Sequence, residues 1–152
     1  MNENERKIYK YALSFREAIN KAIDNGEFKG CLLKDFPRGC CAVASDLLQR
    51  FLLDRKIKTY CIFGEFGYGP KGESHVWLQT ENGIVIDITG DQYAFNKQLE
   101  FSSQVYVGPL EDGFHNLFNI TDSIEYTPNN DPFIKKTKNE IAYETVLKYI
   151  ND

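Results

Sequence analysis

Two adjacent cysteines, Cys40 and Cys41, stand where a loop in the sequence gives way to a helical pattern. Pro37 and Gly39 interrupt regular structure before them, and apolar residues recur every three or four positions after them. A thiol in the first turn of a helix faces unpaired N–H groups and the positive end of the helix dipole, which favour its thiolate form. This position therefore suits a nucleophile. The alternative is that both cysteines are small core hydrophobes, which is common for free thiols.

His75 and Asp87 are expected to approach each other across a hairpin, because Asn82-Gly83 between them favours a tight turn. Positions whose numbers sum to about 165 then face each other, which places Asp87 opposite a residue near 78. A carboxylate in an apolar strand is unfavourable without a partner, and a histidine supplies one. The alternative has Asp87 capping the turn that follows it and His75 exposed at a loop edge.

Together, Cys41, His75 and Asp87 would form a complete nucleophilic unit. The thiolate attacks a carbonyl carbon, the imidazole accepts and returns a proton, and the carboxylate fixes the imidazole tautomer. His115 is expected to be a satisfied surface or core histidine, and the alternative is that it supports the site from behind the first residues. No Cys-x-x-Cys or His-x-x-x-His pair occurs, so we expect no metal and no cofactor. Free thiols are expected at all four cysteines: Cys31, Cys40, Cys41 and Cys61.

The elements that must position these side chains are predicted as helices first and strands after. Hydrophobic periodicity predicts helices over residues 3–24, 41–55 and 140–150. Alternating patterns predict strands over residues 58–63, 74–80, 83–88 and 104–107. The polar stretch 119–138 is expected to be irregular. This order indicates one α+β domain over residues 1–152, with the helices packed on an antiparallel sheet.

Composition narrows the class of partner. With 152 residues, 42% of them hydrophobic and 26% charged, the chain suits one globular domain. A net charge of −4 argues against nucleic acid or an anionic membrane as the main partner. No apolar run approaches the roughly 20 residues that cross a bilayer. The polar opening MNENERKIYK predicts no secretory signal, so a cytoplasmic location is expected, with export by a signal-free route left open.

The order of Cys, His and Asp also resembles the papain-like superfamily, especially its transglutaminase-like branch. The resemblance lies in Cys41 at a helix start, His75-Val76-Trp77 on a strand and Asp87 one strand later, and it spans residues 36–92. Asp-Ile-Thr-Gly-Asp-Gln at 87–92 resembles stretches in small bacterial proteins of this type. The resemblance to the papain-like superfamily implies a papain-like/transglutaminase-like core. It also implies a cysteine-dependent acyl-transfer enzyme: a peptidase, an amidase or deamidase, or a transglutaminase-like enzyme. The implied substrate is a peptide, a protein or a small amide.

The resemblance also favours one of the two thiols. Papain-like nucleophiles follow a glycine and one small residue, and have a serine four positions later. Gly39-Cys40-Cys41 with Ser45 fits this pattern when Cys41 is the nucleophile and Cys40 fills the small-residue position. Cys40 remains the alternative nucleophile.

The sequence departs from the papain-like pattern where a side-chain donor to the oxyanion is expected. Six residues before the nucleophile stands Asp35, which cannot donate a hydrogen bond when it is ionised. The oxyanion hole would then need the Cys41 backbone N–H and a second donor, for which Gln92 and Arg38 are the candidates. Trp77 is expected to pack beside the site, and Asp91 is an alternative to Asp87 as the acid that orients His75.

Two other function classes remain open from the sequence. One is a binding or immunity-type module that uses the same fold without catalysis. The other is a toxin or effector domain that shares the chemistry and differs in its target. The chain is also shorter than most peptidases of the superfamily, which leaves little material for an extended peptide groove.

Overall fold

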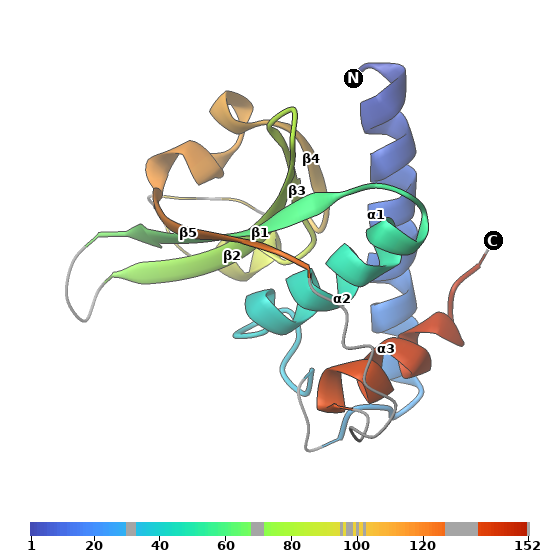
Figure 1. Ribbon diagram of the computed structural model, residues 1–152. Helices are drawn as coiled ribbons and strands as arrows, with labels where there is room; N and C mark the ends of the chain where they lie inside the picture. Colours follow the sequence, from blue (N-terminus) through green and yellow to red (C-terminus); the bar gives the residue numbers. More distant parts are fainter. Residues whose placement is uncertain are drawn as a thin grey trace.

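The computed structural model describes residues 1–29, 33–67, 72–94, 96, 99, 101, 103–126 and 137–151. Within these residues, three helices pack on one face of a five-stranded antiparallel sheet, as expected for the α+β class (Figure 1). The helices are α1 (Glu3–Asp24), α2 (Cys41–Asp54) and α3 (Lys138–Leu147). The predicted helix boundaries are therefore confirmed to within three residues. None of the described helices is long and apolar enough to cross a membrane. Of the four cysteines, Cys31 lies outside the described residues.

The sheet has the strand order β4-β3-β2-β1-β5, with every neighbouring pair antiparallel. Its strands are β1 (Thr59–Phe66), β2 (Glu73–Thr80), β3 (Ile84–Asp87), β4 (Tyr106–Pro109) and β5 (Asn119–Glu125). In the β2–β3 hairpin, Leu78 pairs with Ile86 and Gln79 pairs with Val85, one position from the predicted register. Strand β4 begins two residues later than predicted.

The expectation of irregular structure after residue 119 is wrong for β5. Every residue of this strand is exposed, so its sequence lacks the alternation of buried and exposed positions that marks a half-buried strand. It forms because its backbone pairs with β1 at the edge of the sheet, which is a long-range interaction. A bulge between Phe63 and Gly64 shifts that pairing by one residue.

The two faces of the sheet carry separate cores. The helix-side core contains Val76, Leu78 and Ile86 together with the buried faces of the helices. The opposite core contains Trp77 and Val85 under short 3-10 segments, which are η2 (Gly90–Tyr93), η3 (Leu110–Asp112) and η4 (Phe114–Leu117). Because side chains alternate along β2, both cores are fixed by the same strand.

Candidate active site

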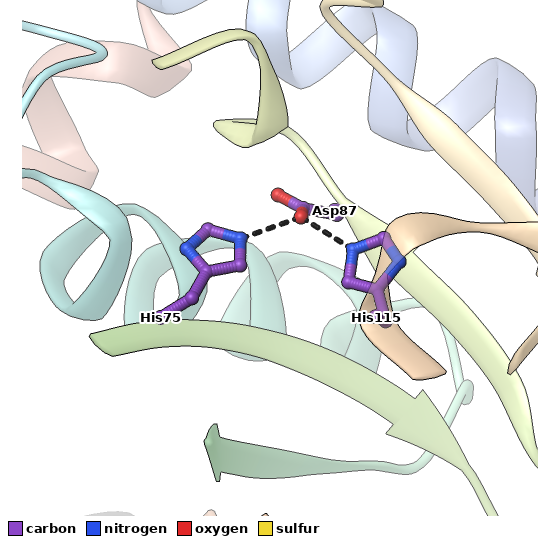
Figure 2. A group of neighbouring side chains, drawn as sticks. All are labelled: His75, Asp87 and His115. Carbon is purple, nitrogen blue, oxygen red and sulfur yellow. Dashed lines mark hydrogen bonds and ion pairs between the residues drawn. The ribbon is translucent and has the colours of Figure 1, made fainter. Parts of the chain in front are cut away.

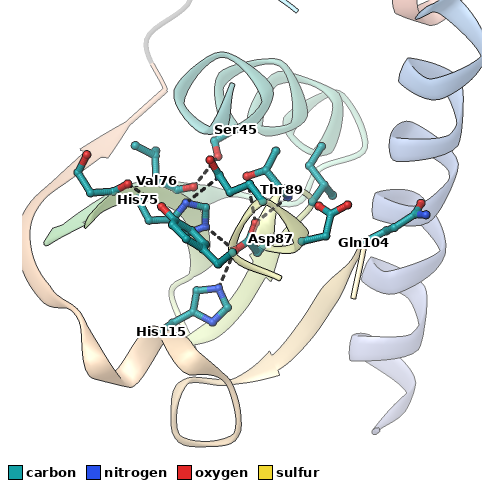
Figure 3. A network of polar contacts seen from close by, with 12 residues as sticks. Ser45, His75, Val76, Asp87, Thr89, Gln104 and His115 are labelled. Atoms are coloured by element: carbon teal, nitrogen blue, oxygen red, sulfur yellow. Dashed lines mark hydrogen bonds and ion pairs between the residues drawn. The ribbon is translucent and has the colours of Figure 1, made fainter. Parts of the chain in front are cut away.

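Cys41 is the first residue of α2, and its thiol meets the sheet at β2. Gly39 has a φ of 68°, a left-handed conformation that favours glycine and turns the chain into the helix. The His75 ring and the backbone of Val76 are close enough to the Cys41 thiol to lower its pKa. Ser45, one turn along α2, donates to the Val76 carbonyl at 3.3 Å and ties the helix to the strand (Figure 3).

Cys40 has a different environment from its neighbour. It is buried in the helix-side core, whereas Cys41 is partly exposed. The Cys40 sulfur lies 3.3 Å from the carbonyl oxygen of Arg38. Burial and the negative charge of Asp35 raise the pKa of the Cys40 thiol. Of these two thiols, Cys41 is therefore the one placed against His75.

Behind the thiol, Asp87 lies between two imidazoles (Figure 2). Its Oδ2 is 2.6 Å from His75 Nε2 and 2.7 Å from His115 Nε2. Its Oδ1 accepts a hydrogen bond from the Thr89 backbone N–H at 2.8 Å. A carboxylate accepts and does not donate, so both Nε2 atoms carry their protons and His75 Nδ1 is left to face the thiol. Asp87 thus fixes the His75 tautomer that can accept a proton from Cys41.

The surroundings favour charge separation between the thiol and the imidazole. Burial raises the pKa of Asp87, but the positive charge of His75 and hydrogen bonds from both histidines hold it well below its usual range. Burial lowers the pKa of His75, and Asp87 together with the Cys41 contact raises it to about 9. Burial also raises the pKa of Cys41, yet its hydrogen bond to His75 and the charge of that ring bring it below the usual thiol value. The group can therefore hold a thiolate–imidazolium pair.

Aromatic rings enclose the imidazole of His75. The ring centroids of Trp77, Tyr93 and Phe114 lie 5.8, 5.0 and 5.7 Å from the His75 centroid. Trp77 is fully buried in the opposite core and packs beside the site, as its place in the strand predicts. These rings exclude water from His75, which strengthens its interaction with Asp87.

Gln92 lies next to His75, whereas the structure gives no such contact for the side chain of Arg38 within the described residues. Gln92 Nε2 is 3.4 Å from His75 Nδ1, and its Oε1 accepts from the Gly39 N–H at 3.4 Å. Its amide is therefore a donor within reach of a group bound at the thiol. The side chain of Arg38 is exposed, and its described contact with the cysteines is through the backbone carbonyl.

Asp91 does not contact His75 but pairs with Arg16 of α1. Two nitrogen–oxygen distances of 2.9 Å join the guanidinium to the Asp91 carboxylate. The same guanidinium donates to the carbonyls of Ile88 at 2.6 Å and Gln104 at 3.4 Å. Arg16 is 4% exposed, so this ion pair anchors the turn between Asp87 and Gln92 from inside the molecule. Asp87 is the acid that orients His75.

His75, Asp87 and His115 could also be considered as a metal centre, because their ligand atoms lie within 4.8 Å of one another. Ligands of one tetrahedral ion at about 2.1 Å would be about 3.4 Å apart. The observed separations of 2.6 and 2.7 Å are those of charge-assisted hydrogen bonds. The side chains are at most 1% exposed. The arrangement therefore fits a hydrogen-bonded cluster.

Sequence reasoning missed the contacts of His115 and Arg16. His115 is buried, as the core environment predicts, and its hydrogen bond to Asp87 agrees with the alternative that it supports the site, although the sequence did not indicate this partner. It lies on η4, which has no periodic pattern to indicate its direction. Arg16 carried a usable signal, because Ile8, Ala12 and Arg16 are spaced by four residues on the buried face of α1.

We expect His115→Phe to lower the free energy of unfolding by about 1–3 kcal/mol, because Asp87 loses one of its buried donors. The Cys41 alkylation rate at pH 7 should fall by less than tenfold, since His75 still contacts Asp87. Urea unfolding and alkylation kinetics measure the two effects. His115→Gln is the matched control, because its amide can still donate. Equal stability of His115→Phe and the wild type would contradict a supporting role for His115.

Comparisons with protein-family models, curated proteins and solved structures found no match.

Proposed function

We propose that the protein is a cysteine-dependent acyl-transfer enzyme with Cys41 as nucleophile, His75 as proton carrier and Asp87 as the orienting acid. The observation that supports this proposal is the arrangement of a partly exposed Cys41 thiol, whose pKa the neighbouring His75 ring lowers, and a His75 ring that is bonded at 2.6 Å to the buried Asp87. The residue order and the α+β architecture are compatible with a papain-like/transglutaminase-like core, and we propose that relationship as well.

In the proposed reaction the Cys41 thiolate adds to the carbonyl carbon of a carboxamide or ester. The His75 imidazolium gives its proton to the leaving amine or alcohol as that bond breaks, and a thioester forms on Cys41. Water or an amine then attacks the thioester, and His75 takes a proton from this second nucleophile. The Cys41 thiolate is restored, and the product is an acid or a new amide.

The negative charge that develops on the carbonyl oxygen needs donors. The Cys41 backbone N–H at the start of α2 is one, and Gln92 Nε2 is the side-chain donor that lies nearby. Gln92 thus takes the place of the donor that the sequence lacks at Asp35. The substrate class is a peptide, protein or small amide, and the acceptor is water or an amine.

Limiting alkylation distinguishes the two neighbouring thiols. At pH 7, iodoacetamide should label Cys41 about tenfold faster than an ordinary thiol, because an ordinary thiol is only a few per cent ionised at this pH. Peptide mass mapping identifies the labelled cysteine. Cys41→Ala should abolish the fast phase, and Cys40→Ala is the matched control that should leave it unchanged. His75→Ala should slow the phase sharply.

Two results would change the assignment. Preferential labelling of Cys40 would move the nucleophile by one residue. Equal, slow labelling of the cysteines in the folded protein would remove the support for catalysis and favour a binding module on the same fold.

A further inference from the structure

A cavity of about 300 Å³ lies between α2 and the strands β1 and β5. The outer edge strand β5 is exposed along its whole length. The volume is at the lower end of the range of ligand pockets, about 300–1,000 Å³. It therefore suits a single side chain or a small ligand.

This cavity is next to the proposed nucleophile. Ala42, which follows Cys41 in α2, is part of its wall. Phe63 of β1 is another wall residue and pairs with Val76, whose backbone contacts the Cys41 thiol. Burial, followed by the charges of Asp46 and Cys41, raises the pKa of the wall residue Cys61 to about 12. Cys61 is therefore within electrostatic reach of both groups.

The walls combine apolar surface with hydrogen-bond acceptors. Cys61, Phe63 and Ile124 supply the apolar part. Gln49, a wall residue, uses its Nε2 to donate to the carbonyls of Thr59 at 3.0 Å and Ile124 at 3.4 Å, and the carboxylate of Asp46 supplies an acceptor. A ligand that matches these walls has an apolar stem and a hydrogen-bond donor at its end.

The negative charge of the cavity wall indicates that the hydrogen-bond donor at the end of the ligand is a cation. Asp46 lines the cavity and accepts a hydrogen bond from Asn139 at 2.7 Å. It has no ion pair among the described residues, whereas Glu125 is paired with Lys58 at 2.9 Å. The nearby cation Arg50 stacks on the ring of Tyr143, with 4.4 Å to its centroid. The Asp46 carboxylate is thus the charge available to a ligand.

We propose that this cavity binds an aliphatic side chain that ends in an ammonium or guanidinium group, on a substrate whose acyl carbon reaches Cys41. The inference rests on the proposed function of Cys41 and adds the class of substrate. The stem lies along Phe63 and Ile124, and the cationic end pairs with Asp46.

Chloroacetamides with tails of similar length ending in ammonium, methyl or carboxylate test this assignment. The Cys41 thiolate displaces chloride and forms a thioether, so no other reactant is needed. At pH 7 the ammonium reagent should alkylate Cys41 about fivefold faster than the methyl reagent, the range expected for a partly exposed ion pair. The carboxylate reagent should be the slowest. The rates are measured from the mass of the Cys41 adduct in the full-length protein.

Two variants of the cavity check the cause of this preference. Asp46→Asn should remove the preference for the ammonium tail, so that the ammonium and methyl reagents alkylate Cys41 at similar rates. Ile124→Lys, at a wall position that is 47% exposed, should reverse it by adding a cation. Glu111→Gln, on η3, is the matched control and should keep the wild-type order of rates.

The outcomes separate this inference from the proposed function. Fast reaction of Cys41 with iodoacetamide and equal rates with the three tails would overturn the cationic pocket and leave the nucleophile in place. Slow reaction of Cys41 with every reagent would overturn both. Persistence of the ammonium preference in Asp46→Asn would overturn the role of Asp46 and with it this assignment.

Discussion

Asp87→Asn should abolish the rapid alkylation of Cys41 at pH 7 and move the inflection of its rate toward the ordinary thiol pKa of about 8.5. In the wild type, the pKa of Cys41 is lowered, so the inflection lies closer to neutrality. Asparagine would hold no negative charge beside His75, which removes the main cause of the raised His75 pKa. Once the activity is assayed, the turnover should fall by about 10³–10⁴-fold, as expected when a triad acid is neutralised.

The same variant should change how stability depends on pH. Because the folded-state pKa of Asp87 is depressed, its contribution is present above the unfolded value of about 3.9 and is lost at lower pH. Because the pKa of His75 is raised to about 9, its contribution is full below the unfolded value of about 6.5 and is lost as pH rises through 9. The difference in unfolding free energy between wild type and Asp87→Asn should therefore be largest between about pH 4 and 6.5.

Urea unfolding at pH 5, 7 and 9.5 measures this difference. Thr89→Val is a control that keeps the charge of Asp87 and the backbone N–H bond to it, and removes only the longer hydroxyl contact at 3.4 Å. A wild-type advantage that stayed constant from pH 5 to 9.5 would show that His75 does not ionise against Asp87. An alkylation inflection shared by Asp87→Asn and the wild type would contradict the role of Asp87 in activating Cys41.

Local patterns explain why much of the site could be predicted from the sequence. The start of α2 at Cys41 follows from a glycine and a helical repeat, both within a few residues. The approach of His75 to Asp87 follows from strand alternation and a tight turn. The two side chains meet although the observed pairing of β2 with β3 differs by one position from the predicted pairing. The histidine side chain spans the remaining offset between the two strands.

Contacts between distant segments account for what the sequence did not predict. The His115–Asp87 bond joins positions 28 residues apart through a segment without periodicity. Strand β5 is exposed on both faces and depends on its pairing with β1, so no local pattern marks it. The Arg16–Asp91 pair spans 75 residues, and only the position of Arg16 on an apolar stripe indicated that it needs a buried partner.

Arg16→Met should lower the free energy of unfolding by about 3–5 kcal/mol, the range for removing one partner of a buried ion pair. Methionine fills a similar space but leaves the Asp91 carboxylate and the Ile88 and Gln104 carbonyls without this donor. Urea unfolding at pH 7 measures the change. Arg6→Met is the matched control, because Arg6 is exposed on the same helix and should change stability by no more than about 0.5 kcal/mol.

The effect of Arg16 should extend to the thiol, because the turn that it anchors carries Asp87 at one end and Gln92 at the other. In folded Arg16→Met, Cys41 should alkylate more slowly than in the wild type, since Asp87 and Gln92 are held less firmly against His75. Arg16→Met combined with Asp91→Leu should recover part of the stability, because no unpaired carboxylate remains. It should not recover the alkylation rate, because the Ile88 carbonyl still lacks its donor. Recovery of both quantities in the double variant would show that Arg16 serves only to neutralise Asp91.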